Sequence, residues 1–506
     1  MRFPVPDKFE PKYVALFVAA LFLVQQIEHT SIMFSCLCAL YTILFALAFN
    51  GSGGLLYLSG AFIFFNGILT ALLGLVVKCV LGEPGDSNLL NPGKTMLVYC
   101  AGMFVMGVAG YVSHLLIPKR GLLSGLAAGE TMMRAAAGCL LLGVFIQLIT
   151  AGAGGPGTLA SALGQLNHFI QMAIILATTY QIRHSGGKSS TNWVVFTAGG
   201  WILFFGLIGF SKEGMFMPFI TWLIPAMALR YSFSKAQVIG GALLGVFILY
   251  YMVPYSQYVR LYRDENGSAI ADTETALYYL GDLNETRRLY LQQEQSAVDT
   301  EGLHYYDTDQ GLFDRLVMLP IDDALISYTD QGNVFGLLPV YVSFLNVIPH
   351  FLSPNKVSLY SGNVFAREIG VIGSDDTSTG ISFSPAADAY HEATWFGVLI
   401  VEPLVMFLLF FSVDALTGSV RESPWALLPI SMASHIAPEG LLGGAIYLMT
   451  YGTAALIFVA LLAKYVLPLV SGVLLGLERT RVQKTVVFRP IPTQSRISAP
   501  PPKRIF

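Results

Sequence analysis

The sequence predicts an all-α protein that crosses a membrane about twelve times. Of its 506 residues, 54% are hydrophobic and only 12% are charged, and the mean hydropathy is +0.61. A soluble protein has roughly a quarter of its residues charged. This chain lacks that polar cover, so most of its surface must face lipid. The formal net charge of -3 gives no sign of a nucleic-acid partner.

Twelve apolar stretches are candidates for membrane spans. A helix needs about 20 apolar residues to cross the hydrocarbon core of a bilayer, and the first, eighth and eleventh stretches are shorter. The twelve lie near Tyr13–Gln26, Ser31–Phe49, Leu55–Val77, Met96–Ile117, Met132–Ala151, Ala162–Ile182, Trp193–Phe210, Met215–Leu229, Val238–Pro254, Trp395–Asp414, Pro424–Ile436 and Leu441–Tyr465.

The positions of lysine and arginine set the expected orientation. Short cytoplasmic connections are enriched in these residues. With the N-terminus in the cytoplasm, basic connections such as the one at Lys119 and Arg120 fall inside, and the connections poor in Lys and Arg fall outside. Both termini are then cytoplasmic. We expect a bundle of about nine helices over residues 1–254, an external loop over 255–394, about three helices over 395–465 and a basic, proline-rich tail over 466–506.

The external loop is the one long polar segment of the chain, and long loops are usually functional. Within it, Asn333–Ser353 is apolar but interrupted by Pro339 and Pro349. We interpret this stretch as a re-entrant or surface-lying helix. If it instead spans the membrane, the loop divides and the orientation of everything after it changes.

Cationic side chains recur on the external side, where the usual distribution disfavours them. They contact either lipid phosphates and loop acids, or a diphosphate, which the planar guanidinium group matches with two hydrogen bonds. In the tight turn at Lys212 and Glu213, the lysine either pairs with the glutamate or faces the same external space. The candidate diphosphate-binding residues are Arg260, Arg263, Arg315, Arg367 and Lys212.

A group of acids and a histidine precedes the tenth span. If this segment is helical, Asp388 lies on one helix face with His391 and Glu392. Such a group at the membrane–water boundary either accepts a proton from a sugar hydroxyl, with Asp or Glu as base and His as base or orienter, or caps the helix N-terminus. His435, with Glu439 nearby, ends the eleventh span and is interpreted as a favourable charge at a helix C-terminus.

Motifs for metal or nucleotide chemistry do not occur in the sequence. It contains no HExxH motif and no P-loop, and its five cysteines lie in or beside apolar runs, where they resemble small buried apolar residues. We therefore expect no metal and no cofactor.

Three motifs near the end of the external loop resemble those of the bacterial O-antigen and exopolysaccharide repeat-unit polymerases, the Wzy type. Ile348, Pro349, Pro354 and Lys356 match an "IPR…P.KP" element, with His350 in place of the Arg and Val357 in place of a Pro. Two shorter matches follow, a Ser/Thr segment at Thr377, Ser378 and Thr379 and an aromatic–Gly helix entry at Phe396 and Gly397. Asp388 stands near a position where Glu is common, and His391 and Glu392 replace a polar–aromatic pair.

The resemblance implies a fold like the GT-C class of membrane glycosyltransferases, located in the bacterial inner membrane. The substrates would be polyprenyl-diphosphate-linked oligosaccharides, joined by glycosyl transfer on the periplasmic face, with a chain-length regulator and other export proteins as partners. Asp388, with Glu392 or His391, would supply the base, and arginines would hold the departing diphosphate without a metal.

Two other functions remain open. A transporter or flippase of lipid-linked saccharides would carry charges along several spans and broken helices at mid-membrane. An O-antigen ligase would have nearly the same architecture as a polymerase and would differ only in its acceptor.

Overall fold

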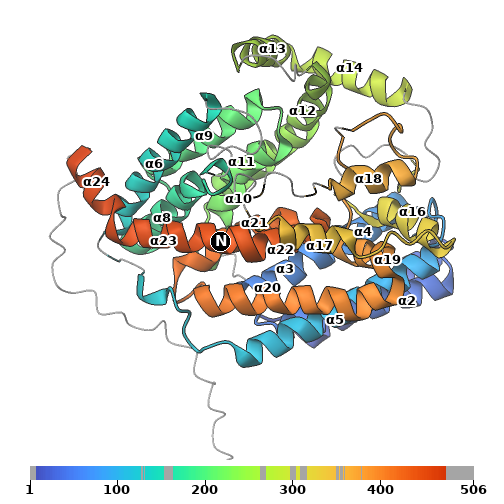
Figure 1. Ribbon diagram of the computed structural model, residues 1–506. Coiled ribbons are helices and arrows are strands. Elements are labelled where there is room, and N and C mark those ends of the chain that lie inside the picture. Colours follow the sequence, from blue (N-terminus) through green and yellow to red (C-terminus); the bar gives the residue numbers. More distant parts are fainter. Residues whose placement is uncertain are drawn as a thin grey trace, which may run out of the picture.

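The computed structural model describes residues 7–126, 129, 131–152, 163–262, 269–296, 304–307, 316–348, 353, 357, 359–377 and 379–474. Every regular element in these ranges is a helix (Figure 1). The all-helical architecture agrees with the fold class expected from the sequence.

The first half of the chain contributes two groups of helices (Figure 1). The first group is α1 (Pro11–Ile27), α2 (Ile32–Gly51), α3 (Leu58–Gly67), α4 (Leu73–Leu81) and α5 (Pro92–Leu116). The second group is α6 (Met132–Gly152), α8 (Phe169–His184), α9 (Trp193–Ile208), α10 (Lys212–Ala228), α11 (Lys235–Phe247) and α12 (Val253–Val259).

The second half begins with shorter helices and returns to the bundle. The shorter helices are α13 (Ala269–Gly281), α14 (Leu283–Ser296), α16 (Leu319–Asp330), α17 (Leu338–Leu345) and α18 (Ser361–Glu368). The chain then forms α19 (Pro385–Phe396), α20 (Glu402–Thr417), α21 (Leu427–Glu439), α22 (Leu441–Tyr447), α23 (Thr453–Tyr465) and α24 (Leu467–Leu474).

The described parts of the twelve apolar stretches are largely helical, and together they mark a membrane-embedded protein. Among the described residues, seven helical segments are long and apolar enough to cross a membrane. These segments are Ile32–Gly51, Leu58–Leu81, Pro92–Leu116, Met132–Thr150, Lys235–Tyr262, Pro385–Thr417 and Leu441–Tyr465.

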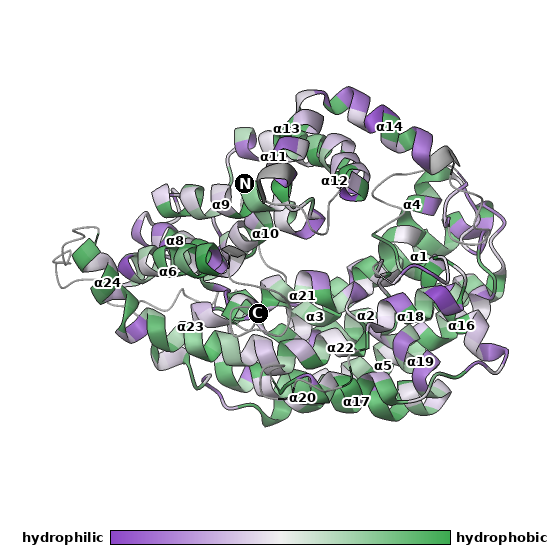
Figure 2. Ribbon diagram, turned by 45° about the horizontal axis from the view of Figure 1, so that its top comes forward, coloured by the Kyte–Doolittle hydropathy of each residue, from purple (hydrophilic) through white to green (hydrophobic). Residues whose placement is uncertain are grey.

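The hydrophobic core lies where α5 packs against both α2 and α20 and where α21 packs on α3. Helices α17 and α20 are largely hydrophobic, whereas α14 is largely hydrophilic (Figure 2). This contrast agrees with the polar composition of the external loop expected from the sequence.

The structure bears on three of the expected boundaries. Helix α19 consists of two helices joined at a kink at Ala393 and Thr394, so the helix of the tenth span begins at Trp395 as expected, and a short helix that starts at Pro385 precedes it. Within Asn333–Ser353, the helix α17 has 8 residues, a length of about 12 Å against a hydrocarbon core of about 30 Å, so this helix does not span. The tail expected from residue 466 begins with the apolar helix α24, which packs on α6 and donates a hydrogen bond from Ser471 Oγ to the Arg134 carbonyl at 2.8 Å.

The helical segment Pro385–Thr417 is interrupted near its start. Thr394 has φ 52° and ψ -135°, a strained backbone for a β-branched residue. At the break, the carbonyls of His391 and Glu392 accept from the backbone N–H groups of Phe335 (3.0 Å) and Gly336 (2.9 Å). The turn before α17 therefore supplies hydrogen-bond donors to the two carbonyls at the break.

Candidate functional site

A cavity of about 810 Å³ lies between α3, α10 and α21. One part of its wall is polar and brings together side chains that lie far apart in the sequence. These polar residues include Ser211, Lys212, Glu213, Arg260, His435 and Glu439. The cavity therefore unites two of the expected diphosphate-binding residues with a histidine and two acids.

Two helix ends position the cationic residues Lys212 and Arg260. Ser211 caps the N-terminus of α10, because its hydroxyl accepts the Gly214 N–H at 3.1 Å. Lys212 and Glu213 follow in the first turn. Arg260 comes directly after α12 and donates from Nη2 to the Phe210 carbonyl at 3.5 Å, which holds it beside the turn that precedes α10.

The last turn of α21 supplies the imidazole. His435 and Glu439 are four residues apart on one helix face, and Nδ1 of His435 lies 2.5 Å from Oε1 of Glu439. Nε2 lies 3.9 Å from Oε2 of Glu213, on α10. The imidazole thus lies between two carboxylates that belong to two different helices.

The rest of the wall is apolar and follows α10 away from its N-terminus. It includes Phe64, Phe65, Phe216, Leu223 and Met227. From Glu213 to Ala228, both of which line the cavity, α10 rises about 22 Å. Leu223 is 40% exposed, so the cavity reaches the surface of the molecule along this helix. The arrangement fits a ligand with a polar head and a long apolar tail.

The expected catalytic residues lie on α19, which agrees with the expectation that this segment is helical. They are, however, buried in the protein interior. Asp388, His391 and Glu392 are at most 1% exposed and are absent from the cavity wall. Nδ1 of His391 lies 2.8 Å from Thr329 Oγ1, and Nε2 lies 3.1 Å from Glu368 Oε2. Both ring nitrogens of His391 therefore already have partners.

Asp388 is connected to the cavity through the backbone. Its Oδ2 accepts the Leu442 N–H at 2.7 Å, at the start of α22. Leu441 N–H donates to the Phe383 carbonyl at 3.2 Å. These two bonds join the segment before α19 to the junction after Glu439, so Asp388 fixes the backbone behind the polar wall.

The remaining expected diphosphate-binding residues are not brought to the cavity by the described structure. Arg263 and Arg315 lie outside the described residues. Arg367 is half-buried near the end of α18 and is not among the residues that line the cavity.

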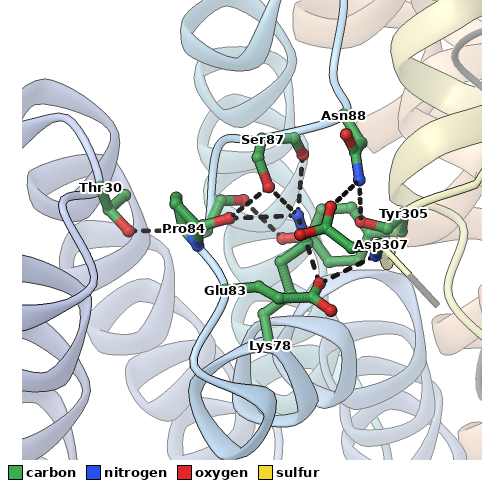
Figure 3. Close-up of polar contacts among 9 residues, drawn as sticks. Thr30, Lys78, Glu83, Pro84, Ser87, Asn88, Tyr305 and Asp307 are labelled. Carbon is green, nitrogen blue, oxygen red and sulfur yellow. Dashed lines mark hydrogen bonds and ion pairs between the residues drawn. The ribbon is translucent and has the colours of Figure 1, made fainter.

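Residues 304–307, in the segment expected to form the external loop, are attached to the helix bundle by a buried lysine (Figure 3). Lys78, fully buried near the end of α4, donates to the carbonyls of Pro84 (3.1 Å) and Ser87 (2.9 Å). Its ammonium group lies 4.4 Å from the centre of the Tyr305 ring, a cation–π contact. Tyr305 donates from its hydroxyl to the Gly85 carbonyl at 2.7 Å, so it is a packing residue here.

Two aspartates attach α16 to the bundle. Asp323 accepts from Thr95 Oγ1 at 2.6 Å and from the backbone at the start of α5. Asp322 accepts from Tyr99 Oη at 2.6 Å and from the Ser384 N–H at 3.1 Å. Burial raises the pKa of Asp322 to about 7, although its hydrogen bonds with Ser384 and Tyr99 oppose the shift.

Sequence reasoning placed Lys212 and Arg260 on one side of the membrane but interpreted His435 and Glu439 as the end of a helix. The i,i+4 spacing of the histidine and the acid was the available signal. The polar wall around them depends on the packing of α10 against α21, which no local pattern predicts.

No family model, curated protein or solved structure matches this chain.

Proposed function

We propose that this protein polymerises polyprenyl-diphosphate-linked oligosaccharide repeat units into O-antigen or exopolysaccharide, by glycosyl transfer on the external face of the membrane. The observation that supports the proposal best is the cavity between α3, α10 and α21, which combines a polar wall with an apolar channel. A lipid-linked sugar has the same division into a charged, hydroxylated head and a hydrocarbon tail.

The cationic part of the wall suits the diphosphate. Lys212 and Arg260 line it, and arginine binds phosphate oxygens through charge-assisted hydrogen bonds. Lys212 lies in the first turn of α10, where the helix dipole also favours a negative ligand. Positive charge at this point stabilises the diphosphate as it leaves.

The acidic part of the wall suits a sugar. Glu213 and Glu439 flank the imidazole of His435 and would repel a phosphate placed directly between them. Carboxylates accept hydrogen bonds from hydroxyl groups, so this part of the cavity fits the glycan. The polyprenyl chain would follow the apolar side chains of α10.

The remaining features of the function follow from this assignment. The protein would reside in the bacterial inner membrane with both termini in the cytoplasm, and a chain-length regulator and other export proteins would be its partners. A GT-C-like fold and about twelve spans belong to the same proposal.

Transport of lipid-linked saccharides is the second candidate, and one observation favours it. The segment Pro385–Thr417 is broken at Thr394 and contains the buried acids Asp388, Glu392 and Glu402. Broken helices with buried charges are typical of transporter binding sites. The break here is closed by hydrogen bonds from Phe335 and Gly336, which is why we prefer the enzyme.

Glycan length in cells tests the proposal. Lys212→Ala and Arg260→Ala should shift surface glycan to single repeat units while the protein stays in the membrane, and Lys235→Ala, at an exposed position at the start of α11, should not. Lipid-linked units accumulating on the cytoplasmic face would indicate transport instead. Full-length polymer retained on its carrier would indicate a ligase.

A further inference from the structure

The imidazole of His435 has an orientation fixed by its own helix. Glu439, one turn later, holds Nδ1 at 2.5 Å. A carboxylate only accepts, so this contact places a proton on Nδ1, and in the neutral imidazole Nε2 is then an acceptor. A base oriented by a neighbouring acid is the arrangement that general-base catalysis uses.

The second ring nitrogen of His435, Nε2, faces a ligand-sized space. The side chain of His435 is 44% exposed and lines the cavity. Its Nε2 lies 3.9 Å from Glu213 Oε2, too far for a direct hydrogen bond. A hydroxyl group placed beside Nε2 would lie within reach of both the imidazole and the Glu213 carboxylate.

The charges around His435 come from three elements. Glu439 lies on its own helix, Lys212 and Glu213 lie on α10, and Arg260 follows α12. The carboxylates stabilise the cationic imidazolium that forms when the base takes a proton. The cations of the same wall would hold the diphosphate, so base and leaving group would share one cavity.

We propose that His435 is the general base of the transferase and that Glu439 is its positioning residue. The inference rests on the proposed function and assigns the base to a residue other than the buried Asp388, His391 and Glu392. The acceptor hydroxyl gives its proton to Nε2 of His435 as its oxygen forms a bond to the anomeric carbon of the donor. The bond from that carbon to the diphosphate breaks, and the lipid diphosphate leaves with the electron pair. The proton then passes from His435 to water.

Elongation rate and carrier binding, measured separately on the full-length protein, test this assignment. The rate is measured in membranes that contain their own lipid-linked repeat units, and binding is measured with undecaprenyl diphosphate in nanodiscs. His435→Gln should slow elongation about 100-fold or more, as loss of a general base does, while the Kd for undecaprenyl diphosphate stays within about twofold. His184→Gln, at the exposed end of α8, is the matched control and should behave as wild type.

The role of Glu439 is tested by measuring how its substitution changes kcat and KM. Glu439→Gln should lower kcat about tenfold or more with KM unchanged, and Glu439→Asp should restore part of the rate. Elongation by His435→Gln within about threefold of wild type would overturn the assignment. So would a loss of carrier affinity as large as the loss of rate, because His435 would then be a binding residue. Wild-type protein that neither elongates nor binds undecaprenyl diphosphate would instead overturn the proposed function.

Discussion

Replacing Asp322 with asparagine should remove a defined part of the pH dependence of stability. Asp322 is fully buried on α16, and burial raises its pKa to about 7. A carboxyl whose pKa is raised on folding stabilises the protein while it is protonated. Its contribution is therefore complete below about pH 4 and is lost as the pH rises towards 7.

The size of the effect follows from the shift. The difference between about 7 and the ordinary value of 3.8 corresponds to about 4 kcal/mol as an upper limit. Asparagine keeps the contacts, because its Oδ1 still accepts the Ser384 N–H and its amide group can donate to Tyr99 Oη. The variant should therefore gain stability relative to wild type as the pH rises from 4 to 8.

Unfolding in mixed detergent micelles at several pH values measures this difference. Subtracting the two curves cancels the other carboxyls, which are common to both proteins. Asp375→Asn, at an exposed site in the same segment between α12 and α19, is the control and should show the same stability curve as wild type. A constant difference in unfolding free energy between wild type and Asp322→Asn from pH 4 to pH 8 would contradict the titration of Asp322 in this range.

Two further substitutions test the framework around the site. Gly397→Ala should prevent stable insertion, because its Cβ would lie 1.7 Å from the Ala389 carbonyl oxygen, and membrane abundance after extraction checks this. Lys78→Met should destabilise the contact with Tyr305 by about 2–4 kcal/mol and speed proteolysis of the segment between α12 and α19. Lys188→Met, at an exposed position, should not. Equal cleavage of both variants would contradict the role of Lys78 as the anchor of this segment.

Helices were the part of the fold that the sequence predicted well. Long apolar runs such as Ile32–Gly51 carry their own signal, because their composition alone makes lipid their solvent. The break at Thr394 was not predicted, because it depends on hydrogen bonds donated by Phe335 and Gly336, about 60 residues earlier. Hydropathy did not reveal the short helix that begins at Pro385, before the tenth span, because it carries polar residues and is buried in protein rather than lipid.

For the candidate site, the sequence predicted only the two cationic residues. Topology placed Lys212 and Arg260 on the same side of the membrane, and both line the cavity. Asp388 was interpreted as a site residue because it is an acid beside the membrane, but whether such an acid is exposed or buried depends on what packs against it. Here its Oδ2 is held by the Leu442 N–H, a contact between distant segments that no local pattern encodes.

The affinity of the purified protein for undecaprenyl diphosphate in nanodiscs tests most directly whether the cavity binds the lipid-linked substrate. We predict that wild type binds it at least about tenfold more tightly than undecaprenol, which lacks the diphosphate. The Lys212→Ala, Arg260→Ala double variant should lose at least about 100-fold in affinity, since each of the two charge-assisted contacts contributes about 1.5–3 kcal/mol. Equal affinity of wild type for the two lipids, or of wild type and the double variant for undecaprenyl diphosphate, would contradict the assignment of this cavity to the lipid-linked substrate.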